Sequence, residues 1–261
     1  MNAETSQKIE PFDRRARRQL RARAAREVAD FSFLKKHLAE DLAERADDFG
    51  QRWGRVLDLG AHDGCATAAI PADLILRAES ALAYAPEIVC DEDRLPFADG
   101  SFDLVLSAGS LASVNDLPGA LVQVRRALRK DGVFLASFIG GASLGDIRHA
   151  LIEMEVQQSE GASPRVHPMV DAREAPALLQ RAGFADPVVD VSELVIHYRE
   201  PLGMLRDLRG MGEQNVLQSR ARKPLTRRAT AAMIAAVEGL RGPDGRIAAR
   251  LEIITMTGRG V

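Results

Sequence analysis

The sequence predicts a doubly wound α/β fold built on a mainly parallel sheet. From Arg55 onward, short apolar runs alternate with helical or turn-like segments, and Pro and Gly residues separate them. Strands that alternate with helices in this way form parallel sheets covered by helices. The apolar runs read VLDLG, DLILRA, EIVCD, FDLVLS and VFLASFI.

Length and composition predict one domain. The chain has 261 residues, 46% of them hydrophobic, which is enough for one sizeable core but not for a second full domain. No window contains the roughly 18 uncharged apolar residues that a membrane span needs. The net charge of −2 gives no overall attraction to nucleic acid. Cys65, Cys90 and the histidines show no metal-ligand spacing, so we expect a cytoplasmic protein without a metal site.

The first 50 residues are predicted to form a helical segment ahead of the α/β domain at 51–261. Acidic residues interrupt the arginine-rich stretch at 14–26, and no signal-peptide apolar core is present, which argues against a targeting sequence. We expect these arginines to form a solvated helix face. A second helix is predicted by apolar residues at helical spacing, namely Phe31, Leu34, Leu38 and Leu42.

Helical spacing and capping residues predict the later elements. The clearest helix spans 117–129, with Asn115 or Asp116 as its N-cap. The others are helices at 143–158, 172–182, 202–211 and 226–240, and strands at 188–198 and 247–257.

A long insertion at 200–245 is expected to form a helical cap that recognises a protein substrate. Its positive charge suits an acidic partner, although a merely solvated helix surface is the alternative. The basic residues are Arg220, Arg222, Lys223, Arg227 and Arg228.

The segment RVLDLGAHDG, at 55–64, is the first with chemical content. It places an apolar strand with Asp58 near its end before a turn that contains Gly60 and Gly64, and a helix is expected to follow. In a doubly wound sheet such a turn lies at the carboxyl edge of the strands, where ligands bind. Glycine lets a ligand approach the backbone closely. An ordinary strand–turn–helix corner is the alternative for this motif taken alone.

Three further motifs follow in order. Glu79 stands 19 residues after Gly60, about where nucleotide sites place an acid for the ribose hydroxyls. The acidic run CDED at 90–93 then precedes LPF, and FDLV forms the next strand. Together these motifs resemble those of the class I methyltransferases. The resemblance, with right-handed crossovers for the first five strands, implies a seven-stranded sheet of order 3-2-1-4-5-7-6 whose C-terminal strand is antiparallel.

Longer segments resemble one subfamily, among them VNDLPGALVQVRRALRKDGVFLASFIGG, LLQRAGF and RDLRGMGEQN. They are similar to the methyltransferase-like assembly factors of mitochondrial complex I and their bacterial relatives. The likeness to the carrier-protein methyltransferases of biotin synthesis is looser. The likeness to the assembly factors extends from Phe12 to about Gly258. The resemblance implies a bacterial cytoplasmic protein that acts on a protein such as a respiratory-chain subunit.

The resemblance also implies a site for S-adenosylmethionine, with Glu79 near the ribose and Asp91 and Glu92 beside the adenine. Methyl transfer depends mainly on proximity, so no catalytic residue is expected to stand out. The other implied cofactor residues are Asp58, Gly60, Ala61, His62, Gly64 and Ser107. Ser110 and Asn115 are weaker candidates for substrate contact, with loop polarity and an N-cap as the alternatives.

The chain also departs from the family pattern. His62 occupies a position in the turn where a small residue is usual. Asp91 follows Glu79 by only 12 positions, so the second crossover helix is expected to be about one turn near residues 80–84 or to be replaced by a loop. Ala112 and Ser113 stand where relatives carry a large aromatic residue. Three functions therefore stay open, namely an S-adenosylmethionine-dependent methyltransferase, an arginine hydroxylase, and a chaperone-like relative that kept the fold without the cofactor.

Overall fold

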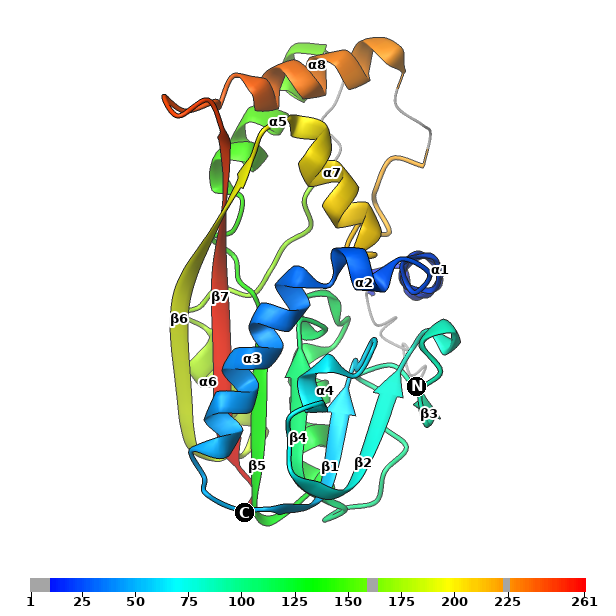
Figure 1. Ribbon diagram of the computed structural model, residues 1–261, viewed down its shortest axis with the longest axis vertical. Coiled ribbons are helices and arrows are strands. Elements are labelled where there is room, and N and C mark those ends of the chain that lie inside the picture. The colour runs from blue at the N-terminus through cyan, green and yellow to red at the C-terminus, as the bar shows by residue number, and fades with distance from the viewer. Residues whose placement is uncertain (1–9, 159–163, 223–225) are drawn as a thin grey trace, which may run out of the picture.

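A computed structural model describes residues 10–158, 164–222 and 226–261. Its centre is a seven-stranded sheet of order β3-β2-β1-β4-β5-β7-β6 (Figure 1). Strands β1 to β5 pair in parallel, and β7 runs antiparallel between β5 and β6. The predicted topology is therefore confirmed. The strands are β1 (Trp53–Leu59), β2 (Ala72–Glu79), β3 (Ile88–Val89), β4 (Phe102–Ala108), β5 (Leu128–Ile139), β6 (Ala185–Tyr198) and β7 (Ile247–Arg259).

Helices cover both faces of the central strands. Side chains alternate along β1, so Leu57 joins the core with α4 and α6, while its neighbour Val56 joins the core with α3. Figure 1 shows α3 crossing one face of the sheet. The helices are α1 (Arg14–Ala24), α2 (Val28–Phe31), α3 (Phe33–Asp47), α4 (Leu117–Ala127), α5 (Gly145–Gln158), α6 (Ala175–Ala182), α7 (Pro201–Gly210) and α8 (Arg227–Glu238).

Local chemistry explains where the best-predicted helices begin and end. Asp116 caps α4 by accepting a hydrogen bond from the Gly119 N–H, so Asp116 rather than Asn115 is the N-cap. Pro118 lies in the first turn of α4, where no helical N–H is needed. Gly183 ends α6 in the left-handed conformation that glycine adopts readily.

The two crossovers next to β2 contain almost no helix. Only the 3-10 turn Cys65–Thr67 follows the turn after β1, so the helix expected there is wrong. The physical reason is length, because a crossover with its helix needs at least about 10 residues and only residues 65–71 separate Gly64 from β2. The second crossover is the 3-10 turn Leu82–Tyr84, as the spacing predicts.

The long strands β6 and β7 extend beyond the core to a helical cap. Helices α5, α7 and α8 share a separate apolar cluster there, and α7 also contacts α1 and α2 (Figure 1). The described part of the insertion at 200–245 thus contains two helices, α7 and α8. No helix within the described residues is long and apolar enough to cross a membrane.

We expect Gly210→Ala to loosen the attachment of the cap. A Cβ at Gly210 would lie 2.1 Å from Cγ of Phe31 on α2, whereas a Cβ at Gly203 on the same helix would come no closer than 3.3 Å to Tyr198. Gly210→Ala should lower the free energy of unfolding by about 1–3 kcal/mol through overpacking. Gly203→Ala is the matched control and should be neutral or stabilising, because alanine is the better helix former. Equal stability of the two variants in urea unfolding would contradict this.

Candidate functional site

The turn after β1 is tightly closed. Gly60 and Gly64 have positive φ angles of 70° and 77°. The N–H groups of Gly60 and Ala61 both donate to the carbonyl of Ala78 on β2, at 2.8 and 3.1 Å. A Cβ on Gly60 would lie 2.2 Å from Oγ of Ser110. This glycine is therefore required by protein packing, and its N–H is already used.

His62 fills the position in the turn that sequence comparison marked as unusual. It has a positive φ of 50°, and its ring stacks on Tyr84 with centroids 5.1 Å apart. The side chain is buried, and burial holds the pKa of the imidazole well below 6.5, so the ring is neutral. Its Nε2 has no hydrogen-bond partner among the described residues. His62 therefore brings an unpaired polar atom into an otherwise enclosed place.

Glu79 is saturated with hydrogen bonds from its own chain. Its carboxylate accepts from the side chain of Arg21 at 3.0 Å and from Oγ of Ser80 at 2.9 Å. It also accepts from the N–H groups of Ala81 and His62, at 3.1 and 3.3 Å. A carboxylate offers about four lone-pair sites, so four donor groups use its whole capacity. Burial alone would raise the pKa of Glu79, but the positive groups around it, with Arg21 the strongest, together outweigh burial and keep the carboxyl ionised.

Arginines of α1 form ion pairs with the acids that are predicted to hold the adenosine. Arg21 is 1% exposed and pairs with Glu79, and Arg17 forms a two-pronged pair with Glu92 at 2.6 and 2.7 Å. Parallel hydrogen bonds of this kind are the strongest that arginine makes with a carboxylate. The outer pairs are Arg18 with Asp91 at 2.5 Å and Arg14 with Asp93 at 2.6 Å. The expected solvated arginine face is therefore wrong, and the acidic turn is not solvated either.

The spacing of these arginines explains the correction. Arg14, Arg17, Arg18 and Arg21 stand at i, i+3, i+4 and i+7, which is one face of a helix and is normally the buried face. Four cations there meet four carboxylates, so the buried charges balance. Sequence reasoning missed this face because it read the segment by composition. The spacing, set beside an equal number of predicted site acids, was the available signal.

Asp58 lies beneath the turn next to a lysine that the sequence reading did not single out. Asp58 accepts a hydrogen bond from Oγ1 of Thr67 at 3.1 Å, and burial raises its pKa to about 6. Lys35 of α3 donates to the carbonyl of Gly60 at 2.8 Å, and burial lowers its pKa. Their charges favour one another, so Lys35 supports the ionised form of Asp58.

The weaker candidates are engaged in holding the chain together. The hydroxyl oxygens of Ser107 and Ser110 lie 2.9 Å apart, and each lies within hydrogen-bond distance of the Leu59 carbonyl, at 2.9 and 3.2 Å. Asn115 exchanges two hydrogen bonds with the backbone of Phe12, which fixes the entry to α1. The structure thus brings the predicted residues together at one sheet edge. Most of their polar atoms are bonded to other groups of the chain, whereas Nε2 of His62 and Oδ1 of Asp58 have no hydrogen-bond partner among the described residues.

S-adenosylmethionine does not fit the site in this conformation. The hydrogen-bond capacity of Glu79 is used, and the other adenosine acids are paired with arginines. The turn N–H groups of Gly60 and Ala61 are bonded to β2, and no helix of useful length follows them. A ribose and an adenine would therefore have to displace α1.

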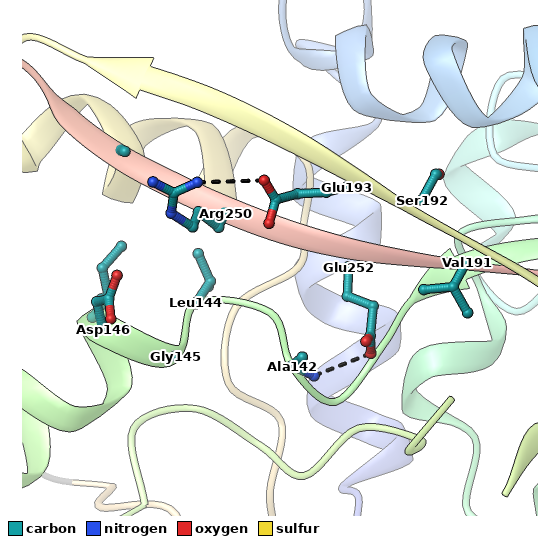
Figure 2. A pocket seen from close by; sticks show the side chains of 11 residues that line it. Ala142, Leu144, Gly145, Asp146, Val191, Ser192, Glu193, Arg250 and Glu252 are labelled. Carbon is teal, nitrogen blue, oxygen red and sulfur yellow. Dashed lines mark hydrogen bonds and ion pairs between the residues drawn. The ribbon is translucent and has the colours of Figure 1, made fainter. Parts of the chain in front are cut away.

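Away from these residues, a pocket of about 410 Å³ lies between the start of α5 and strands β6 and β7 (Figure 2). Three of its charged groups have partners, since Arg250 contacts Glu193 at 3.3 Å and Glu252 accepts from the Ala142 N–H at 3.1 Å. None of the predicted site residues lines it. Among the described residues, no group of three or more His, Cys, Asp or Glu is placed to hold a metal ion.

Comparisons with known proteins agree with this fold. A family described as "Methyltransferase domain" matches residues 48–136. The arginine-hydroxylase NDUFAF5 of Homo sapiens mitochondria is 35% identical over 264 residues, which cover 95% of this chain and 76% of that protein. The malonyl-[acyl-carrier protein] O-methyltransferase of Halorhodospira halophila is 31% identical, covering 97% and 89%. The crystal structure of YcgJ from Bacillus subtilis superposes with a TM-score of 0.58 at 17% identity, covering 86% and 98%, which supports the fold alone.

The chain therefore belongs to the class I methyltransferase family. Within that family it is related both to the arginine-hydroxylase NDUFAF5 proteins and to the malonyl-[acyl-carrier protein] O-methyltransferases. The resemblance read from its motifs is confirmed.

Removing the innermost arginine should strongly destabilise the protein. Arg21→Ala leaves Glu79 buried without its cation, which we expect to lower the free energy of unfolding by about 3–5 kcal/mol at pH 7. Arg23→Ala is the matched control, because Arg23 lies on the same helix but is exposed. It should change stability by less than about 0.5 kcal/mol. Similar losses in urea unfolding for both variants would contradict a special role for Arg21.

The carboxyl group of Asp58 should titrate near pH 6 rather than near its ordinary value of 3.8, because it is buried. A folded pKa above the unfolded one stabilises the fold below about pH 4, and that stability is lost as the pH rises through about 6. Carbon-13 NMR of the Asp58 carboxyl measures the midpoint directly. Thr67→Val removes a hydrogen bond that lowers the pKa and should move the midpoint upward. An unshifted wild-type midpoint near 4 would refute the assignment.

Proposed function

We propose that this chain is a cofactor-free member of its family that binds a partner or ligand instead of methylating one. The observation that carries the proposal is the burial of Arg21 against Glu79. Together with Arg17 on Glu92, it occupies the acids that a ribose and an adenine would need. The loss of both crossover helices beside β2 supports the same conclusion, since those helices would otherwise wall the cofactor site.

Isothermal titration with S-adenosylmethionine tests the proposal on the full chain. We expect no saturable heat up to about 1 mM, a level that reveals complexes held by only about 4 kcal/mol. The malonyl-[acyl-carrier protein] O-methyltransferase of Halorhodospira halophila serves as a comparison under identical conditions. Saturable one-to-one binding by the wild-type chain would overturn the proposal.

A second candidate is an S-adenosylmethionine-dependent methyltransferase whose site is gated by α1. It is favoured by the acids that stand at the motif positions, Glu79, Asp91 and Glu92, and by the methyltransferases among the relatives. In that case wild-type binding would be measurable and would tighten in Arg21→Ala, because α1 would compete less for Glu79. Arg23→Ala would leave the affinity unchanged. Arginine hydroxylation is supported only by the similarity to the mitochondrial arginine-hydroxylase relatives.

The partner is proposed to be a protein with an acidic surface, such as a respiratory-chain subunit, and the location to be the bacterial cytoplasm. Arg222, Arg227 and Arg228 are exposed on the cap and would face it. Arg220 is instead paired with Asp13 at 3.0 Å. Of the basic residues predicted for this surface, Lys223 lies outside the described residues.

A further inference from the structure

A large cavity separates the helical cap from the N-terminal helices. Its volume is about 520 Å³, within the range of roughly 300–1,000 Å³ that is usual for small-molecule sites. It is bounded by α2 and α3 on one side, by α5, α7 and α8 on the other, and by the turn after β1. The arginine and acid cluster does not line it, since neither Arg17, Arg21, Glu79 nor Glu92 reaches its surface. The cavity is therefore separate from the ion pairs that Glu79 and Glu92 form with the arginines of α1.

Most of the cavity wall is hydrocarbon. The cap contributes Met204, Leu208 and Met233, and α5 contributes Ile147 and Leu151. Methionine side chains are flexible and polarizable, so a wall rich in them adapts to ligands of varied shape. A ligand that extends under the cap must therefore be apolar along most of its length.

One end of the cavity is polar. Ser32 and Lys35 stand one helical turn apart at the start of α3 and both line the cavity, and Lys35 reaches the turn that carries His62, where it donates to the Gly60 carbonyl. Ser32 is 4% exposed and His62 8% exposed. Neither Oγ of Ser32 nor Nε2 of His62 has a hydrogen-bond partner among the described residues. Buried polar groups of this kind are normally satisfied, so both atoms call for a ligand group.

The available polar groups favour an acceptor with negative charge. A hydroxyl, a neutral imidazole and an ammonium group can each donate, and among the described residues only one hydrogen bond from the three N–H groups of Lys35 is observed. Across the whole lining, Lys35, Arg165 and Arg209 stand against one acid, Glu213, while Arg165 is paired with Glu155 outside the lining. An anionic head group therefore fits this end better than a cationic one.

We propose that the cavity binds a long-chain carboxylic acid, with its hydrocarbon tail under the cap and its carboxylate toward Ser32, Lys35 and His62. Each contact needs only donors and apolar surface that already line the space. The inference does not depend on the proposed function, because it uses none of the adenosine acids.

Isothermal titration of straight-chain acids into the full chain, without S-adenosylmethionine and below micelle-forming concentrations, tests this inference. Dodecanoate should bind saturably, and affinity should rise about three- to fourfold for each methylene added from hexanoate upward. Dodecanol, which has the same tail without the charge, should bind at least tenfold more weakly. No saturable binding of dodecanoate, or equal affinity for the acid and the alcohol, would overturn the inference.

Three variants locate the two ends of the ligand. Lys35→Met should weaken dodecanoate at least tenfold and leave dodecanol within about twofold. Leu205→Trp fills the cavity from α7 and should weaken both ligands at least tenfold. Leu202→Trp is its control, because Leu202 lies on the same helix but is exposed and outside the lining. Thermal unfolding of each variant verifies that it is folded. Wild-type affinity in Leu205→Trp, or in Lys35→Met, would place the acid elsewhere and refute the proposed site.

Discussion

The buried pairing of α1 with the acidic edge of the sheet is the constraint on which this structure depends. Arg17 and Arg21 each place a guanidinium group where water scarcely reaches, and Glu92 and Glu79 neutralise them there. Buried ion pairs contribute little net stability, but removing one partner leaves a costly unpaired charge. Helix α1 is therefore held to the sheet by its two buried arginines, since neither Arg17 nor Arg21 can leave without such a penalty.

The short crossovers beside β2 and the arginine face of α1 are linked through this pairing. Short crossovers after β1 and β2 remove the helices that would flank an adenosine, and they leave four carboxylates at an open sheet edge. Carboxylates that close together repel each other and would resist burial. The arginine face of α1 supplies the compensating charge. Helices α2 and α3 follow α1 in the chain, and Lys35 of α3 reaches the turn at His62.

Much of the fold follows from the sequence because it depends on local patterns. The runs in β1, β4 and β5 are apolar and bounded by turns, and the short interval from Glu79 to Asp91 correctly predicts a crossover of one turn. The roles of the site residues could not be read in the same way. Which donor satisfies Glu79 depends on a contact with Arg21, 58 positions away, and spacing within one motif contains no information about it. A charged residue on the buried face of a helix also violates the ordinary rule that such faces are apolar.

The acidic edge of the sheet and the apolar cavity differ in whether their polar groups have partners. In a methyltransferase the carboxylates hold the nucleoside and the neighbouring space receives the group to be modified. Here the carboxylates are satisfied within the chain, whereas the neighbouring space keeps two polar atoms, Oγ of Ser32 and Nε2 of His62, with no partner among the described residues. Unsatisfied polar atoms are expensive in a buried place and satisfied ones are not. The polar atoms without a partner thus line the apolar cavity, whereas the nucleoside acids are paired, so a ligand group that bonded to Ser32 and His62 would remove an unfavourable contribution to the free energy.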